Sequence, residues 1–283
     1  MFKKQILEKL ESINQLPAMV SVAAEVERLL NDPKTTIEQL EYAIKNEPVL
    51  TAKVLKLANS AAYAGTRRIV GLNQAISRLG YAELRKLVIA VTFLNLYRPK
   101  VIKYDTFWLH SISTAYTAVK LSEFSPLDFT KDNAFIGAVL HDIGILVFDQ
   151  FFYDLYSKVF EISMQKGIDL LTAERDIMGI THAEAGAILL KKWNLPKEIT
   201  EIVEYHHKPH KSTISPNETK LVYLSNSITN IKGLNFGTNT VQSDFDDSVW
   251  KDLNLSTNDI PKIIEEVQAE IDKAQEFMKL GGR

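Results

Sequence analysis

A histidine and a carboxylate stand next to each other at the end of an apolar run, at His141 and Asp142 after Ala138-Val-Leu. Neutral imidazole and carboxylate are frequent ligands of divalent metals. Buried polar groups need partners, and a metal ion would satisfy both residues at once. Gly144 follows and allows the chain to turn. This pair is therefore the first candidate for a metal site.

The six histidines are unevenly distributed, because all of them lie beyond residue 109. A predicted helix before the pair carries one, another begins the helix after residue 181, and two adjacent ones end the next helix. We expect the packing of these helices to bring the imidazoles together. The candidate metal ligands are His110, His141, Asp142, His182, His206 and His207.

The candidates other than His182 also have an explanation without a metal. His110 on an apolar helix face can be a core histidine, and His141 can bond Asp142 at a helix end. His206 and His207 can be a surface pair near a helix C-terminus, where the helix dipole favours imidazolium. Both explanations stay open at this point.

The composition is that of an ordinary globular protein, with 46% hydrophobic and 24% charged residues. A length of 283 residues allows one large or two medium domains. The net charge of −2 and the pI near 6.3 argue against generic binding to nucleic acids or anionic membranes, which needs a basic excess. The absence of cysteine excludes disulfides and thiolate metal sites.

The N-terminal segment does not have the pattern of a signal peptide, because Glu8 and Glu11 interrupt it and no long apolar core follows. The most apolar run, Leu87 to Leu96, is about half the ~20 residues that a membrane span needs. We expect a cytoplasmic protein without a membrane partner.

Helical periodicity runs through almost the whole chain, and no strand-like alternation of useful length occurs. Thr35 and Glu38 have the spacing of a capping box, and Pro48 suits the first turn of a helix. Residues 146–166 are predicted as one long helix. Residues 233–256, rich in Gly, Asn, Asp and Ser, are predicted as a loop. The fold class is therefore predicted to be all-α.

Arg98-Pro99-Lys100 is the best candidate for a domain boundary. We expect an N-terminal helical bundle over residues 1–99, packed against a second helical domain over residues 100–232. Residues 233–283 are expected to form a loop and an amphipathic C-terminal helix.

Gly80 separates two predicted helices within residues 72–98, an arrangement shared with DNA-binding helix-turn-helix motifs. A recognition helix needs polar and basic side chains that face the groove. The second helix, residues 81–97, is instead rich in Leu, Val, Ile and Phe, with only Arg85 and Lys86 as cations near its start. It is predicted to be a buried core helix, and no DNA partner is expected.

Several segments within about residues 16–210 together form a specific combination. They are Leu16-Pro17, EPVLTAKVLKLANSAAYA (47–64), LNQAISRLG (72–80), FWLHS (107–111), GAVLHDIG (137–144), THAEAGAILLKKWNLP (181–196) and His206-His207. In these segments the chain resembles the HD superfamily of metal-dependent phosphohydrolases. It resembles more closely the HDOD family, the HD-related output domain of bacterial signalling.

The resemblance implies a two-part helical protein with a role in signal output, in a family whose members often lack enzymatic activity. It implies that His110, His141 and Asp142 are ligands of a first metal. His182, with His206 or His207, would match the additional ligands of the cyclic-dinucleotide phosphodiesterase branch. The implied cofactor is a divalent transition metal, such as Fe, Ni, Mn or Zn.

The chain departs from the pattern of the catalytic members at three places. Asn226 stands at or near the later aspartate that completes their first metal site, and a carboxamide is a poorer ligand for a hard cation. Ile145 replaces the lysine after the HDIG motif of the phosphodiesterase branch. Lys208-Pro209-His210 replaces its GYP-type loop. Part of the machinery for hydrolysis is therefore expected to be missing.

The function expected first is a bacterial signal-transduction or regulatory module that binds a signalling protein, or a nucleotide, and has a degenerate HD site without catalytic residues. The alternative is a metal-dependent phosphohydrolase or phosphodiesterase acting on a nucleotide or cyclic dinucleotide. In that alternative, two ions held by the same ligands would activate a bridging water.

Overall fold

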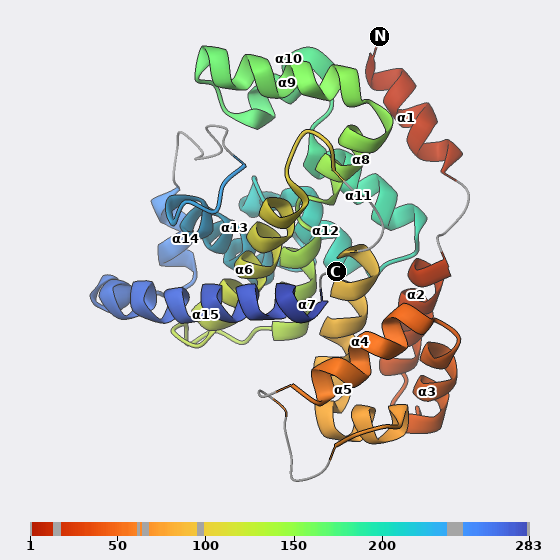
Figure 1. The fold of residues 1–283 in the computed structure, drawn as a ribbon. Helices are drawn as coiled ribbons and strands as arrows, with labels where there is room; N and C mark the ends of the chain where they lie inside the picture. Colours follow the sequence, from red (N-terminus) through yellow and green to blue (C-terminus); the bar gives the residue numbers. More distant parts are fainter. Residues whose placement is uncertain are drawn as a thin grey trace. The chain divides into compact units, whose positions relative to one another are not determined.

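The computed structural model describes residues 2–13, 18–60, 63, 68–94, 99–236 and 246–281 (Figure 1). These residues form helices and turns without a strand, which confirms the all-α prediction. Contacts group the chain into a smaller unit with Asn14–Leu96 and a larger unit with Met1–Ile13 and Tyr97–Met278. The division into residues 1–99, 100–232 and 233–283 stays a prediction, because grouping by packing does not test which parts fold independently.

The described residues of the smaller unit form helices that turns and short irregular segments connect. Pro48 occupies the first turn of its third helix, as predicted. The predicted capping box is wrong by one residue, because Thr36 caps its helix together with Gln39, while the Thr35 hydroxyl donates to the Leu29 carbonyl. The helices of this unit are α2 (Ala18–Leu30), α3 (Ile37–Lys45), α4 (Pro48–Ala58) and α5 (Leu72–Leu94).

Gly80 interrupts α5 with a φ of 77°, in the left-handed region that favours glycine. Beyond this kink the helix is buried at Leu84 and from residue 87 to residue 94. Arg85, one of its two cations, forms a buried ion pair with Glu27 of α2. The described residues of the predicted helix, 81–94, are thus a core helix, as predicted, and residues 95–97 lie outside the described part of the chain.

The larger unit contains the remaining helices. They are α1 (Phe2–Ser12), α6 (Tyr104–Ser122), α7 (Lys131–Leu140), α8 (Ile143–Phe151), α9 (Tyr153–Lys166), α10 (Leu170–Met178), α11 (His182–Lys192), α12 (Lys197–Tyr205), η1 (Pro209–Lys211), α13 (Pro216–Ile231), α14 (Asp247–Asp252), η2 (Thr257–Asp259) and α15 (Ile260–Gly281).

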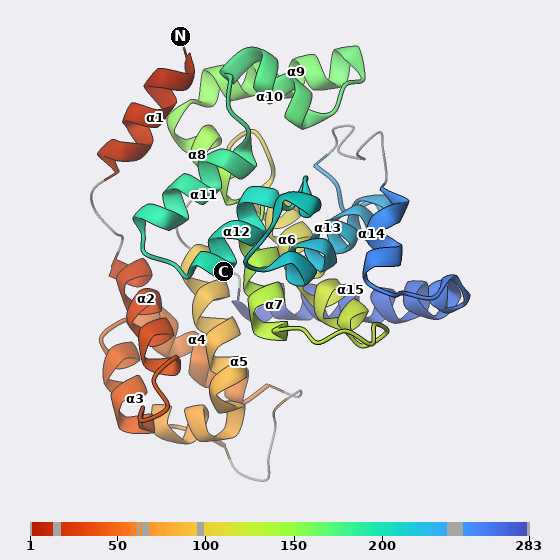
Figure 2. The ribbon, with the colours of Figure 1, turned by 180° about the vertical axis from the view of Figure 1, so that it is seen from behind.

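Four helices of the larger unit, α6, α7, α12 and α13, pack side by side in both views (Figures 1 and 2). A buried hydrogen bond of 2.9 Å between the hydroxyls of Thr114 and Thr229 joins α6 to α13. Helix α8 packs on α11, next to this group. The C-terminal ends of α7 and α12 and the N-terminal ends of α8 and α11 therefore meet around one point in the unit.

Two helix and loop boundaries predicted for this unit are wrong. Residues 146–166 are not one helix, because Phe152 has a non-helical φ of −135° and separates α8 from α9. The predicted loop over residues 233–256 contains α14, whose first turn Asp246 caps by accepting a hydrogen bond from the Ser248 N–H. Residues 237–245 of that segment lie outside the described part of the chain.

One stretch, Lys131–Phe151, is long and apolar enough to cross a membrane by length and composition. It consists of α7 and α8, and 89% of its apolar window is buried inside the fold. The stretch is therefore a core element of the larger unit. The cytoplasmic location stays a prediction.

Glu201 of α12 holds the segment that leads into α13. Its nearly buried carboxylate accepts hydrogen bonds from the Ser212 hydroxyl (2.8 Å) and from the backbone N–H groups of Thr213, Ile214 and Ser215 (3.0, 2.6 and 2.8 Å). Burial opposes the charge, but the donors outweigh it and lower the pKa of Glu201 below its ordinary value of 4.5. The charged form of this side chain therefore stabilises the α12–α13 connection.

We expect Glu201→Gln to lower the free energy of unfolding by roughly 1–3 kcal/mol at neutral pH, because a neutral amide replaces a charged acceptor. A carboxylate whose pKa is lowered by folding contributes its full stability above its ordinary pKa and loses it as the pH falls through the folded-state value. Urea denaturation of both proteins should therefore show a gap that closes below pH 4.5. A gap of constant size at every pH would contradict a role for the charge.

Candidate metal centre

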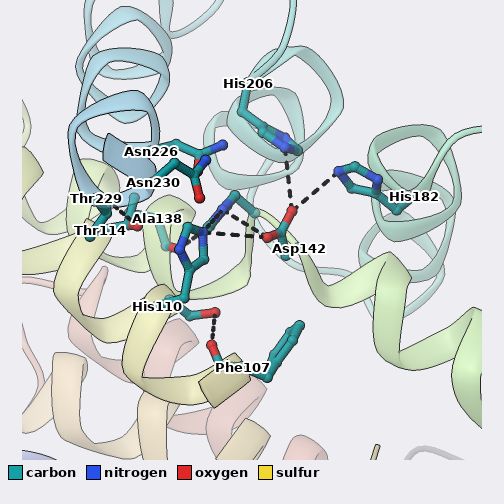
Figure 3. Close-up of polar contacts among 12 residues, drawn as sticks. Phe107, His110, Thr114, Ala138, Asp142, His182, His206, Asn226, Thr229 and Asn230 are labelled. Atoms are coloured by element: carbon teal, nitrogen blue, oxygen red, sulfur yellow. Dashed lines mark hydrogen bonds and ion pairs between the residues drawn. The ribbon is translucent and has the colours of Figure 1, made fainter. Parts of the chain in front are cut away.

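Helix ends from several parts of the larger unit converge on the carboxylate of Asp142 (Figure 3). His141 is the C-cap of α7 and Asp142 the N-cap of α8, so the junction between these helices holds both. His110 comes from the middle of α6, His182 is the first residue of α11, and His206 is the C-cap of α12. All five side chains are buried.

Asp142 contacts imidazoles with both of its carboxylate oxygens. Its Oδ2 is 3.1 Å from His141 Nε2 and 3.6 Å from His110 Nε2. Its Oδ1 is 3.2 Å from His182 Nε2 and 3.6 Å from His206 Nε2. The carboxylate thus divides the histidines into two groups, one on each oxygen.

The outer nitrogen of each of three histidines is held by a backbone carbonyl. His110 Nδ1 lies 2.7 Å from the Leu234 carbonyl oxygen. His141 Nδ1 lies 2.6 Å from the Ala138 oxygen, and His206 Nδ1 lies 2.8 Å from the Val203 oxygen. A carbonyl oxygen only accepts, so Nδ1–H donates and Nε2 carries the lone pair. Metal-binding histidines are oriented in this way.

His182 is held differently, by the carboxylate of Glu174. Its Nδ1 lies 2.9 and 3.0 Å from the two Glu174 oxygens, and its backbone N–H donates to Glu174 Oε2 at 2.8 Å. Glu174 is fully buried in α10 and also accepts a hydrogen bond from the Tyr156 hydroxyl at 2.9 Å. Glu174 was not among the predicted site residues.

The separations between the inner nitrogens have the size of edges in a coordination polyhedron. Metal–nitrogen bonds of about 2.0–2.1 Å place neighbouring ligand atoms roughly 2.8 to 3.4 Å apart in octahedral or tetrahedral geometry. His110 Nε2 and His141 Nε2 are 3.2 Å apart, and His182 Nε2 and His207 Nε2 are 3.0 Å apart. Two nitrogen lone pairs repel at this distance unless a cation or a proton lies between them. The donor set therefore fits a divalent transition metal.

The ligand atoms form two groups that share Asp142, and within each group all of them lie within 4.8 Å of one another. We call the group of His110, His141 and Asp142 Oδ2 the His110 half. The His182 half comprises Asp142 Oδ1, His182, His206 and His207.

Burial keeps three of the histidines neutral, which is the form that binds metal. It lowers the pKa of His110 and of His206 to about 4 and the pKa of His207 well below its ordinary value. His182 differs, because Glu174 and Asp142 outweigh the effect of burial and raise its pKa to about 10. An ion that enters the His182 half must therefore replace a proton on His182.

Gly144 brings the backbones of α8 and α11 into direct contact. A Cβ atom at this position would lie 1.9 Å from the His182 carbonyl oxygen and 2.9 Å from the Gly186 backbone nitrogen. The prediction that Gly144 makes the turn is wrong, because it lies inside α8 and the turn is at His141 and Asp142. The glycine is needed for the close approach that sets His182 beside Asp142.

A cavity of about 30 Å³ adjoins both halves. This volume suits roughly two water molecules, whereas pockets for small-molecule ligands usually measure about 300–1,000 Å³. The Asn230 amide donates to Asn226 Oδ1 at 2.9 Å on one wall of the cavity. The lining residues are His110, Asp142, Ile145, Asp169, Leu170, Leu171, His182, His207, Asn226, Asn230 and Phe236.

Phe236 covers the His110 half. Its ring lies edge-on to the His110 ring, with centroids 4.9 Å apart, and stacks on Phe107 at 5.7 Å. Leu234, two residues earlier, supplies the carbonyl that holds His110. The start of the segment predicted as a loop therefore forms part of the site.

All six predicted ligands lie together, while binding of an ion to them stays a prediction. His210, the sixth histidine, contacts Asp246 at the surface instead. Sequence reasoning missed Glu174 and Phe236. Glu174 falls on an amphipathic helix, where a glutamate resembles a solvated residue, and Phe236 is a single aromatic residue in a polar stretch.

A family model described as HDOD domain matches residues 16–209. A Treponema pallidum (strain Nichols) protein described as uncharacterized is 25% identical over 206 residues, or 72% of this chain. The chain spans 40% of the length of that relative.

Solved structures of similar proteins share the all-α fold. An HDOD domain protein of unknown function from Geobacter sulfurreducens has a TM-score of 0.78 and 22% identity, with 99% of this chain and 98% of that chain covered. A proposed phosphohydrolase from Shewanella amazonensis has a TM-score of 0.78 and 20% identity, with 98% of each chain covered. At these identities the likeness concerns the fold alone.

Proposed function

The chain belongs to the HDOD domain family, and we propose that it is a signalling or regulatory module whose HD-type site binds a divalent transition metal without efficient hydrolysis of phosphodiesters. In this role the site is a structural or ligand-sensing element. A bound ion would supply positive charge between Asp142 and the inward-facing imidazoles and so link the helix ends that meet there.

The donor set supports the metal-binding part of this proposal. The inner Nε2 atoms of His110, His141 and His206 have lone pairs because each Nδ1 is engaged by a carbonyl. No hydrogen-bond partner for the buried His206 Nε2 occurs among the described residues, and it points at Asp142 from 3.6 Å. A buried acceptor without a donor costs free energy, and a metal ion would remove that cost.

The chemistry of the cavity wall is the observation that carries the rest of the proposal. Asn226 offers a neutral carboxamide, and the fully buried Ile145 offers no cation to a phosphate. Phosphoryl transfer depends on positively charged groups and metal ions that stabilise the developing negative charge. A cavity of about 30 Å³ with Phe236 in its wall is also small for a phosphodiester beside the ligands. Binding without efficient turnover is what this environment favours.

Hydrolysis of bis(4-nitrophenyl) phosphate, a small activated phosphodiester, tests this proposal. We expect the wild-type chain, loaded with Mn²⁺ or Fe²⁺, to hydrolyse it at the rate of the metal ion in buffer. Asn226→Asp is the matched variant, because it returns one carboxylate to the cavity wall without changing side-chain size. Wild-type hydrolysis that is clearly above background and is abolished by Asp142→Ala would overturn the proposal in favour of a metal-dependent phosphohydrolase.

The partner of such a module is proposed to be a signalling protein, with a nucleotide as the second candidate. Val70 and Tyr42 of the smaller unit, 77% and 66% exposed, are apolar side chains that a protein partner could cover. The net charge of −2 does not favour DNA.

A further inference from the structure

The two halves of the centre differ in what stands behind their histidines. In the His110 half, both imidazoles donate to neutral backbone carbonyls, those of Leu234 and Ala138. In the His182 half, one imidazole donates to the carboxylate of Glu174. A carboxylate behind a ligating histidine makes the inner nitrogen a stronger donor than a carbonyl does, because it stabilises positive charge on the ring.

Three hydrogen-bond donors hold the Glu174 carboxylate in its position behind His182. The Tyr156 hydroxyl donates to Oε1 at 2.9 Å, the His182 backbone N–H donates to Oε2 at 2.8 Å, and His182 Nδ1 faces both oxygens. Both Glu174 and Tyr156 are fully buried. A buried carboxylate is costly unless it is paired, and the pairs here direct its charge at His182.

The two halves also differ in the number of ligands. The His182 half offers three imidazoles and Asp142 Oδ1, whereas the His110 half offers two imidazoles and Asp142 Oδ2. Asn226, which lines the cavity beside both halves, contributes no charge and already accepts a hydrogen bond from Asn230. The number of ligands and the nearby negative charge of Glu174 therefore both favour metal binding in the His182 half.

We infer that Glu174 is a positioning residue that makes the His182 half the tighter part of the centre, so that the first equivalent of a divalent transition metal binds His182, His206, His207 and Asp142. This inference rests on the proposed function. Three imidazoles and one carboxylate select Fe²⁺, Co²⁺, Ni²⁺ or Zn²⁺ over Mg²⁺ and Ca²⁺, which prefer oxygen ligands.

Removing the charge of Glu174 should weaken binding of this first ion. A partner of this kind is typically worth about 10–100-fold in metal affinity. Glu174→Gln keeps the size of the side chain and one acceptor oxygen, so the loss would measure the charge. Glu201→Gln is the matched control, because Glu201 is another nearly buried carboxylate of the same unit that accepts several hydrogen bonds but contacts no ligand.

Titration of the full-length chain with Co²⁺, followed by its visible absorption bands, tests the inference. We expect a tight first equivalent in the wild type, about 10–100-fold weaker binding with altered bands in Glu174→Gln, and unchanged binding in Glu201→Gln. Two further variants locate the ion independently of Glu174: His207→Ala should lose the tight equivalent, and His110→Ala should keep it.

The outcomes separate this inference from the proposed function. Absence of tight Co²⁺ binding by the wild type would refute both. Tight binding that Glu174→Gln leaves unchanged, or that His110→Ala abolishes and His207→Ala retains, would overturn the inference alone. If Glu174→Gln does not fold, the pair of histidine variants still decides which half is tighter.

Discussion

Replacing Asp142 with asparagine should abolish tight metal binding in both halves of the centre at once. Asp142 is the one carboxylate among the ligands, and its two oxygens face different groups of imidazoles at 3.1–3.6 Å. An amide carries no negative charge and has only one oxygen, so it cannot replace the carboxylate toward both groups of imidazoles. We expect the affinity to fall by more than about 100-fold, since even an outer-shell partner is worth up to that much. Elemental analysis of the dialysed protein measures the loss.

Asp149→Asn is the control for this prediction. Asp149 lies on the same helix, is fully buried, and accepts hydrogen bonds from the backbone N–H groups of Lys100 and Val101 at 2.7 and 2.8 Å. Its replacement should reduce stability and leave the metal content unchanged. Equal metal content in wild type and Asp142→Asn would show that the imidazoles do not depend on this carboxylate.

Gly144→Ala is expected to have the second large effect, on stability and metal binding together. The new Cβ atom would lie 1.9 Å from the His182 carbonyl oxygen and 2.7 Å from its carbonyl carbon, so α8 and α11 must separate. Overpacking of this kind costs typically about 1–3 kcal/mol and sometimes more. Here both clashing atoms belong to the backbone, so we expect a loss of stability of at least about 3 kcal/mol. Separation also moves His182 away from Asp142 and should weaken metal binding.

Thermal unfolding and metal analysis of the same preparation check this second prediction. Gly137→Ala is the comparison, because the atoms nearest to a Cβ there belong to the Ile202 side chain, with Cγ2 at 2.5 Å, and not to backbone. It should lower stability less and leave the metal content unchanged. A Gly144→Ala protein with wild-type stability would rule out the close backbone contact.

Local signals in the sequence predicted the fold class, and the six candidate ligands that the sequence indicated lie together, while their binding to an ion stays a prediction. Thr181 caps the helix that begins at His182, in a capping box with Glu184, and both residues are adjacent or close in the sequence to that histidine. Whether a histidine lies on the apolar face of a helix or at a helix end depends on a few neighbouring residues, and these can be read from the sequence. The six residues could therefore be proposed as candidate ligands before their distances were known.

The supporting residues could not be recognised in this way, because their roles depend on helices that are distant in the sequence. Glu174 gains its role from α11 packing beside α10, and nothing in residues 170–178 distinguishes it from a solvated glutamate. Gly144 was expected to form a turn, but a glycine is required there because any side chain would collide with the His182 carbonyl. Glu38 was predicted to form the capping box with Thr35. The Thr35 hydroxyl instead donates to the end of the preceding helix, so Thr36 is the cap.

The measurement that tests the account most directly is anomalous X-ray scattering from crystals of the wild-type chain grown with Co²⁺ or Fe²⁺. We predict a peak about 2.0–2.2 Å from the Nε2 atoms of His182, His206 and His207 and from an oxygen of Asp142. A crystal without a peak, in which His182 Nε2 donates directly to Asp142, would contradict the account, because a proton would then occupy the position assigned to the metal.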